Sequence, residues 1–487
     1  MKCVWAGGPA ADFANNIMWR FFPEVKIQTS KSNNYPTTPV EGASCTGSGD
    51  TFDVSGGILE CRWVHGKKLQ WIKINTQKGI FANAKSPVSM DMCRLKNSDM
   101  TQFQTGRGQG LNVGFPRTNT DIHGMFIDGV NEVLVMPVDF PDFPGGPTLT
   151  QDLAYDEKMM TDWFRYYSNG KSKFNITSYP QWFRMSKNRS EYPTDAKEKG
   201  ALEVDSNTRQ GNQSQAFIDE ITKVIDLRKF STIYIVFPEG ELTLEAWVVR
   251  NHYFNVKEGK KHLNLFSWSR QNEAMQTERW AYYVHETLHD FQIIGHAPGN
   301  GWPIGMFQNQ SGISYALNPY EQFLLDWLPT DQIYCDDAAT LKAATISLSP
   351  LEREDKQTKL ALIRLSPTRL IAIESHGIDK WSSSNFGDRA FPPGFYSVMA
   401  YIVDLNKAAA PPVRPDGTSL SNDDWAWAVW QKVNGGRSNE FTLTVGNQRI
   451  LGDYVAVLGD SFVIEGVRIK VVGTGDYETI EISRVQP

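Results

Sequence analysis

The middle of the chain alternates between apolar runs and segments of helical periodicity. The run EVLVMPVDFPDFP (132–144) is rich in β-branched residues and ends in Pro and Asp, which is typical of a strand buried on both faces. Residues 152–170 and 215–230 carry apolar side chains at helical spacing. Strand-like stretches, 173–185 and 231–239, follow the two helical segments. This order predicts an α/β layer structure.

Both ends of the chain have a different pattern of apolar and polar positions, which is typical of β-strands. ECRWVHGKKLQWIKI (60–74) alternates apolar and polar positions around a turn and predicts a hairpin. After Trp327, short strand-like runs recur between Gly, Pro or Asn, which favours a β-sandwich. The runs are TISLSPL, KLALIRLS, RLIAIES, GFYSVMAYIV, FTLTV, YVAVLG, FVIEGVRIKVV and ETIEISRV, and 421–437 is expected to be a loop. We therefore expect an α+β multidomain chain divided into residues 1–125, 126–332 and 333–487.

Composition narrows the classes of partner. The formal net charge of −6 argues against a nucleic acid as partner. No apolar run approaches the roughly 20 residues that a membrane-spanning helix needs. The N-terminus shows no apolar signal segment. Oligomeric state is not indicated by the sequence.

Five cysteines favour a secreted or cell-surface protein. Cys45 and Cys61 flank a Gly-rich hairpin and are candidates for a disulfide, whose loop would contribute about 3 kcal/mol. Cys3, Cys93 and Cys335 remain, so one thiol is left over if a second bridge forms. Four glycosylation sequons are compatible with secretion but also arise by chance in a chain of this length.

The segment HETLHDFQIIGH (285–296) carries the candidate chemistry. His285 and His289 are four residues apart on a predicted helix, so both imidazoles lie on one face and can share a Zn²⁺ ion. Glu286 follows the first histidine, where its carboxylate can accept a proton from a metal-activated water. The alternative interpretation is a core helix whose histidine pair is solvated or satisfied by contacts within the core.

A catalytic zinc site needs a third protein ligand. His296, just after the helix-ending Gly295, is the first candidate. Asp290 and Glu321 are alternatives, but Asp290 points away from the histidine face of a helix and Glu321 is expected to be a surface or capping carboxylate. Met306, in the turn-rich GWPIGMFQNQSG, is either a methionine turn beneath the metal or ordinary core packing.

In the order of these motifs, the chain resembles the immune-inhibitor-A-like family of secreted zinc metallopeptidases. The resembling segments are VLVMPVDFPDFP, WFRYYSNGKSKFNITSYPQWFRM, HETLH, GWPIGMFQNQSG, LNPYEQFLLDWL and VLGDSFVIEGVRIKVV, which together span about 130–487. The resemblance implies a zincin-like catalytic domain followed by a β-sandwich. It implies His285 and His289 as zinc ligands, Glu286 as general base and Met306 as methionine turn. The third histidine departs from the metzincin pattern by one residue.

A few other residues are candidates for binding or catalysis. Asp139 and Asp142, at the end of the first buried strand, could hold Ca²⁺ or cap a turn, and we expect capping. Tyr315 and Tyr320 could donate a phenol to an oxyanion, and we expect ordinary packing.

Two functional hypotheses follow. The first is a secreted zinc endopeptidase that acts on a protein or peptide substrate. The second is an extracellular binding or structural protein on a metallopeptidase scaffold, with weak or lost activity. Both share a fold, so the fold alone does not separate them.

Overall fold

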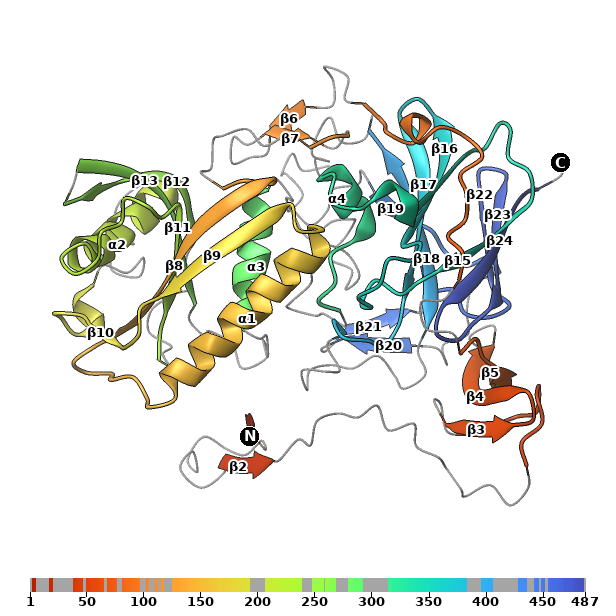
Figure 1. Cartoon of the computed structure of the whole chain (residues 1–487), viewed down its shortest axis with the longest axis horizontal. Helices are drawn as coiled ribbons and strands as arrows, with labels where there is room; N and C mark the ends of the chain where they lie inside the picture. The colour runs from red at the N-terminus through yellow and green to blue at the C-terminus, as the bar shows by residue number, and fades with distance from the viewer. Residues whose placement is uncertain are drawn as a thin grey trace, which may run out of the picture.

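The protein is mixed α/β, with several sheets and few helices distributed over two halves of the molecule (Figure 1). The computed structural model describes residues 2–5, 17–20, 38–46, 50–64, 68–76, 81–96, 102–104, 110–112, 115–117, 125–192, 206–238, 248–257, 259–268, 279–291, 314–382, 396–405, 428–435, 442–445, 448–451 and 454–485.

The first half is built on a six-stranded sheet. In chain order it contains β8 (Gly129–Asp139), α1 (Leu149–Tyr167), β9 (Ser172–Ser178), β10 (Phe183–Arg184), η5 (Arg189–Glu191), α2 (Ser206–Ile221), β11 (Thr232–Val236), β12 (Val248–Val256), β13 (Gly259–Trp268) and α3 (Arg279–Asp290). Strands β9 and β10 pair with one edge of β8, and β11, β13 and β12 follow on the other side. All pairings are parallel except that of the edge strand β12 with β13.

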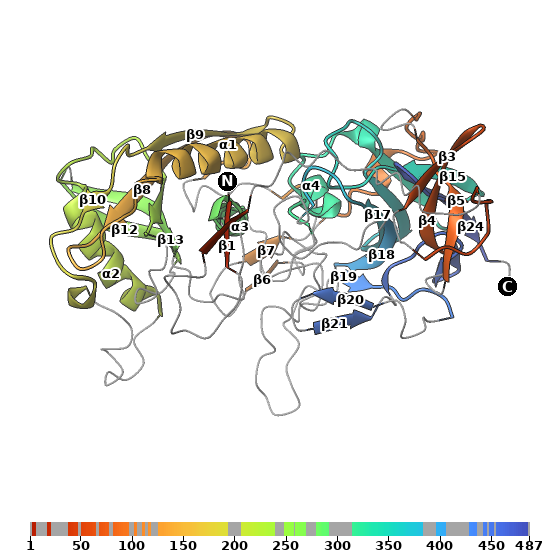
Figure 2. The same ribbon diagram turned by 90° about the horizontal axis from the view of Figure 1, so that it is seen from below.

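The sheet is buried on both faces because its central strands β8 and β11 are almost continuously apolar and successive side chains point to opposite faces. In β8, Val133 and Val135 contact α1 and α3 on one face. Leu134, Met136 and Val138 of the same strand pack with α2 on the other face. The first half is therefore three-layered, with α1 and α3 on one side of the sheet and α2 on the other (Figure 2).

Two further sheets form the second half. The described elements are α4 (Pro319–Leu324), η7 (Thr330–Gln332), β14 (Ile333–Asp337), β15 (Ala344–Leu348), β16 (Leu360–Ser366), β17 (Arg369–His376), β18 (Ser397–Asp404), β19 (Ala428–Trp430), β20 (Thr442–Val445), β21 (Gln448–Leu451), β22 (Ser461–Ile464), β23 (Val467–Gly473) and β24 (Glu478–Arg484). One sheet has the order β14-β16-β17-β18-β19 and the other β15-β24-β23-β22. A shared core that includes Ile363, Ile371, Ile469 and Ile480 joins them face to face. On its other face the five-stranded sheet packs against α4, through Tyr401 and Phe323 among others.

The chain before β8 contributes small sheets and a connecting segment. Its elements are β1 (Lys2–Trp5), β2 (Ile17–Arg20), β3 (Thr51–Val54), β4 (Gly57–Val64), β5 (Lys68–Lys73), η2 (Met90–Met92), β6 (Gln102–Gln104) and β7 (Gly110–Asn112). Strands β3, β4 and β5 form an antiparallel sheet that contains the predicted Cys45–Cys61 disulfide, whose Cα atoms are 5.9 Å apart.

The β3–β5 sheet is attached to the C-terminal part of the chain by a buried arginine. Arg62 donates to Thr474 Oγ1 at 2.5 Å and to Glu60 Oε2 at 2.9 Å, and its guanidinium lies 4.2 Å from the ring centroid of Tyr396. Next to it, Asn75 pairs with the backbone around Gly475, where a Cβ atom would come within 2.3 Å of the Asn75 nitrogen. Glycine is required there because the two backbones approach closely.

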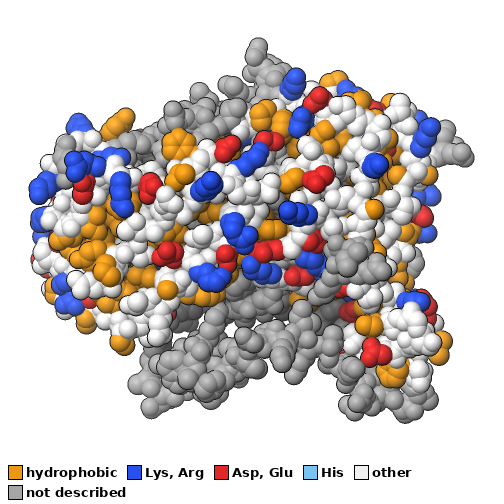
Figure 3. Space-filling model, in the orientation of Figure 1, with side chains coloured by type: hydrophobic (Ala, Val, Ile, Leu, Met, Phe, Trp, Pro, Cys, Tyr) orange, Lys and Arg blue, Asp and Glu red, His pale blue; other side chains and the backbone are white. Residues whose placement is uncertain are grey.

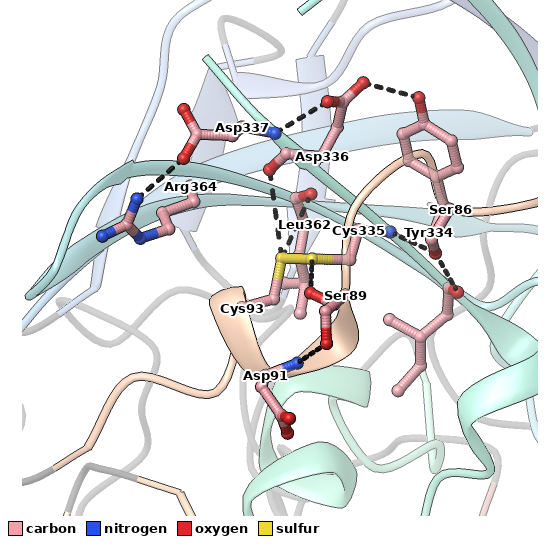
Figure 4. The surroundings of a disulfide bond; sticks show 11 residues. Ser86, Ser89, Asp91, Cys93, Tyr334, Cys335, Asp336, Asp337, Leu362 and Arg364 are labelled. Carbon is pink, nitrogen blue, oxygen red and sulfur yellow. Dashed lines mark hydrogen bonds and ion pairs between the residues drawn. A yellow bond between two sulfur atoms is a disulfide. The ribbon is translucent and has the colours of Figure 1, made fainter. Parts of the chain in front are cut away.

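A second disulfide, Cys93–Cys335, joins η2 to β14 (Figure 4). Ser86 Oγ accepts from Cys335 N at 2.9 Å, so the segment is also held by a hydrogen bond beside the bridge. The bridge closes a loop of 242 residues, which by chain entropy corresponds to about 5 kcal/mol of stabilisation. The segment before β8 is therefore attached to the second half covalently and by packing.

The structure confirms the predicted strands β8, β9 and β11, the helix α1 and the two hairpins around Gly56 and 65–67. Three expectations about secondary structure were wrong, at 215–230, 454–459 and 421–437. The predicted helical segment 215–230 includes Val224, but α2 ends at Ile221 and Val224 is 52% exposed. YVAVLG (454–459) is a turn with one isolated bridge, Val398–Ala456, instead of a strand.

The expected loop at 421–437 contains β19, which pairs with β18. Among the described residues, no helix has the length and apolarity required to cross a membrane.

The two bridges predict the number of free thiols. They use four of the five cysteines, so Cys3 has no cysteine left to pair with in its own chain. Titration of the unreduced chain in guanidinium chloride with a thiol reagent should therefore give one thiol per chain, and five after reduction. Cys3→Ser, as the control, should give none before reduction. A reading of three or more thiols in the unreduced wild type would contradict one of the bridges.

Candidate metal centre

Helix α3 carries the HETLH motif and is held by its apolar face. Trp280, Val284 and Leu288 are fully buried against α1 and the sheet, at the i, i+4, i+8 positions of one helix face. Phe291, just after the helix, packs against Trp327 with ring centroids 5.6 Å apart. The sequence forms a helix here because this apolar stripe can be covered along its whole length.

Hydrogen bonds fix α3 to the central strand β11. Tyr283 Oη donates to the Ile235 carbonyl at 2.7 Å, and the hydroxyls of Tyr234 and Thr287 lie 2.5 Å apart. The rings of Tyr234 and Tyr283 stack with centroids 4.4 Å apart. Burial raises the pKa of both phenols, so they remain neutral hydrogen-bonding groups at physiological pH. These contacts set both the rotation and the height of the helix on the sheet.

The first turn of α3 is attached to α1. Arg279 donates to the Asp156 carboxylate, with Nε 2.5 Å from Oδ2. Asp156 is buried on α1, so the pair ties the start of the motif helix to its neighbour. Burial by itself lowers the pKa of Arg279, but Asp156 outweighs it and the pKa is raised, so the guanidinium stays charged.

The motif residues lie away from the buried stripe. At about 100° per residue, His285 and His289 differ by about 40° around the helix axis and about 6 Å along it, and Glu286 is next to them. His285 is buried and Glu286 is half-buried. Asp290 lies about 140° from His285 around the axis, so it cannot serve with the histidine pair as a ligand on the same helix face. Asp290 itself is buried.

The remaining predicted site residues lie outside the described residues. This applies to His296, to Met306 and to the side chain of His289, whose backbone belongs to α3. Within the described part of the chain, no group of three His, Cys, Asp or Glu side chains is arranged to hold a metal ion. The described residues thus provide the helix, His285 and Glu286 of the proposed site.

Glu321 differs from the expectation of a surface or capping carboxylate. It is 1% exposed on α4, where it forms an ion pair with the equally buried Arg117. The cap of α4 is Asn318, whose Oδ1 accepts from the backbone nitrogens of Tyr320 and Glu321 at 2.9 and 3.2 Å. Ligation of a metal by Glu321 would leave the Arg117 guanidinium buried without this partner, which is costly.

The other candidates have structural contacts. Tyr315 and Tyr320 are buried in two different apolar cores, as expected for ordinary packing. Asp139 accepts from Gly145 N at 2.8 Å and from Arg184 Nε at 2.6 Å, and Asp142 accepts from Arg189 N at 3.0 Å. These contacts agree with the expected turn-capping role. Although burial raises the pKa of Asp139, these donors hold it below its ordinary value.

A buried histidine that the sequence analysis did not single out lies in the second half. His376 is 2% exposed, with Nδ1 2.8 Å from Glu352 Oε1 and Nε2 2.9 Å from Glu374 Oε1. Glu374 Oε2 also accepts from Asn318 Nδ2 at 2.9 Å and from Tyr401 Oη at 3.0 Å. Because His376 and Glu374 alternate on a strand that reads as ordinary core, only the tertiary structure shows that they meet Glu352.

Charge explains this cluster. Burial by itself lowers the pKa of His376, but the two carboxylates outweigh it and raise the pKa from 6.5 to about 10. The imidazolium in turn holds the pKa of Glu352 below its ordinary value against the effect of burial. A buried imidazolium between two carboxylates is thus a structural unit that links β17 to the cap of α4.

This cluster predicts a pH dependence of stability. The stabilisation by His376 is fully present below its unfolded pKa of about 6.5, where the side chain is protonated in both states. It is lost as pH rises towards about 10, because in this range the folded protein keeps a proton on His376 that the unfolded chain has released. His376→Gln should lower the free energy of unfolding by about 3 kcal/mol at pH 6 and by less at pH 9.5. Urea unfolding at both values measures it. An equal loss at both pH values would contradict a charged His376.

Comparison with known proteins adds no assignment to this geometry. No family model matches the sequence, and no curated protein matches it.

Proposed function

We propose that the protein is a secreted zinc-dependent endopeptidase, with His285 and His289 as ligands and Glu286 as general base. The observation that carries the proposal is the position of HETLH on α3. The apolar face of this helix is fixed to the sheet and to α1, while its histidine and glutamate positions lie away from that face. Two histidine positions one turn apart on a helix that is fixed by its other face suit a metal ion that demands defined ligand geometry.

The donor set fits zinc. Imidazole nitrogen is a preferred zinc ligand, and two of them at i and i+4 on one helix form a common half-site. His296 is proposed as the third ligand. When bound, Zn²⁺ would supply Lewis acidity to activate a water and polarise a carbonyl.

A residue of the protein would then transfer the protons of the reaction. Glu286 is next to the first histidine and is half-buried, so its carboxylate can accept a proton from the attacking water. It can return that proton to the amide nitrogen as the peptide bond breaks. Because α3 is fixed by Tyr283 and Thr287, Glu286 does not have to be repositioned between the two steps.

The arrangement of the first half supports a zincin-like core. The motif helix follows the last strand of a mixed sheet and contacts β13, the neighbour of the antiparallel edge strand β12. An edge strand offers unpaired backbone groups to which an extended peptide can bind. A peptide substrate is therefore the class that this side of the molecule suits best, and the two packed sheets of the second half fit the proposed β-sandwich domain.

Secretion is proposed on the disulfides. Cys45–Cys61 and Cys93–Cys335 are structural bridges of the kind that persist in oxidising compartments. The alternative function, an extracellular binding or structural protein on the same scaffold, is favoured by the large share of the chain that lies outside the motif domain.

The peptidase proposal predicts a separation of metal binding from cleavage. The purified chain should contain about one zinc per molecule and should cleave a quenched peptide. Glu286→Gln should keep the zinc and lower kcat/KM by at least about 100-fold, because the proton acceptor is lost. As a control, Glu157→Gln changes a half-buried glutamate on a different helix, α1. It should keep both the zinc content and the cleavage. A metal-free protein, or a Glu286→Gln variant with unchanged cleavage, rules out this mechanism.

The third ligand is tested by a metal titration. His296→Ala should weaken zinc binding by at least about 100-fold, because a three-ligand site loses one donor. Glu321→Gln should leave zinc affinity unchanged and lower the melting temperature instead, because the buried Arg117 loses its counter-ion. The opposite pattern would exchange the roles of the two residues.

A further inference from the structure

A cavity of about 150 Å³ lies where the C-terminal end of α1 meets η7 and the turn between β15 and β16. It is lined by Arg165, Tyr166, Tyr167, Asn169, Gln322, Trp327, Leu328, Pro329, Gln332, Leu351, Asp355, Lys356 and Lys359. Figure 1 shows this end of α1 reaching towards α4, so the cavity lies between the two halves of the molecule. None of its lining residues belongs to the proposed zinc site.

One part of the cavity wall is apolar and is held in place by hydrogen bonds and packing. Trp327 is held by a hydrogen bond from its indole nitrogen to the Ile127 carbonyl at 2.9 Å, and Leu328 and Leu351 are buried beside it. Tyr167 donates to the Leu351 carbonyl at 3.2 Å, so its phenol is already engaged. A cavity of this volume in a protein core can hold a molecule about the size of benzene.

Two buried amides line the same cavity without complete hydrogen bonding. Gln332 is 8% exposed, and its side chain has no hydrogen-bond partner among the described residues. Gln322 is 6% exposed; its Nε2 donates to the Leu317 carbonyl at 2.7 Å, while within the described chain nothing donates to its Oε1. The two amides therefore offer hydrogen-bonding groups to a polar occupant of the cavity.

The charges of the cavity favour an anion. At its base, Asp355 is satisfied by Lys359 Nζ at 2.9 Å and Ser349 Oγ at 2.6 Å, so this pair is neutral and has no free acceptor. Lys356 is exposed and has no ion pair among the described residues. Arg165 lies 3.7 and 3.9 Å from its nearest carboxylates, too far for a hydrogen bond. The lining thus contains Lys356, which has no ion pair among the described residues, and Arg165, which is shared between two long ion pairs.

Arg165 belongs to a band of mixed charge. Lys158, Asp162, Glu354 and Lys380 form further pairs around it, and Figure 3 shows positive and negative side chains interspersed over the middle of this face, where α1 runs. Within this band Arg165 is balanced by carboxylates, so the unbalanced positive charge at the cavity comes from Lys356.

We propose that this cavity is a binding site for a small carboxylate whose apolar body is about the size of a benzene ring or a leucine side chain. The body packs against Trp327 and Leu351. The carboxylate accepts from the Gln332 amide and is attracted by Lys356 and Arg165. Such a ligand can be a free organic acid or the C-terminal residue of a short peptide. The inference goes beyond the peptidase proposal and does not depend on it.

Calorimetric titration of the full-length chain tests the site. Phenylacetate is the probe, phenylacetamide is its neutral isostere, and N-acetyl-leucine represents a peptide C-terminus. Phenylacetate should bind about tenfold more tightly than the amide, because a hydrogen bond to a charged group is stronger than one to a neutral group. Titration in EDTA should give the same affinity, which separates this site from any carboxylate binding at zinc. Tighter binding of N-acetyl-leucine than of phenylacetate identifies the peptide source, and the reverse identifies a free acid.

Variants locate the binding. Gln332→Met keeps the size of the side chain and should weaken phenylacetate binding by about tenfold. Lys356→Gln, an exposed change without effect on folding, should weaken it by about three- to fivefold. Lys342→Gln is the matched control, because Lys342 is also exposed but follows β14, whereas Gln332 precedes that strand. Equal affinity for acid and amide, affinity unchanged in both Gln332→Met and Lys356→Gln, or no heat of binding at about 10 mM phenylacetate would overturn the proposal.

Discussion

The attachment of α3 to the central sheet is the interaction on which the proposed chemistry depends. Tyr283 donates to the backbone of β11, Thr287 meets the hydroxyl of Tyr234, and Arg279 binds Asp156 on α1. These polar contacts lie at the border of an apolar stripe, so burial supplies the stabilisation and the hydrogen bonds select one rotation of the helix. A rotation of one residue would turn the histidine positions towards the core.

The two halves of the molecule are held together by several independent contacts. The segment before β8 crosses the second half, where Cys93 is bonded to Cys335 and Arg117 pairs with Glu321. Trp327 and Trp381 of the later chain enter the core that also buries α1 and α3. Consequently the helix with the HETLH motif is packed partly by residues that lie beyond residue 314. The motif helix and the sheets after it therefore share one core.

Sequence patterns predicted the elements with a clear period. Strands buried on both faces were recognised as continuous apolar runs, and the amphipathic α1 was recognised by the 3.6-residue period of its apolar positions. The error at Val224 arose because apolar residues continued the helical spacing past the end of α2. YVAVLG was taken for a strand since its composition is β-like, whereas pairing depends on a partner that the local sequence does not reveal.

The sequence by itself determined the spacing of His285, Glu286 and His289, and hence that a helix would place two imidazoles on one face. It also indicated the Cys45–Cys61 bridge, because those cysteines are local to one hairpin. Only the tertiary structure decided that Glu321 is committed to Arg117, that His376 is enclosed by Glu352 and Glu374, and that Gln322 and Gln332 line one cavity. Arg117 and Glu321, Glu352 and His376, and the two ends of the cavity lining come from separate parts of the chain, and their meeting depends on how whole sheets pack, which no local period encodes.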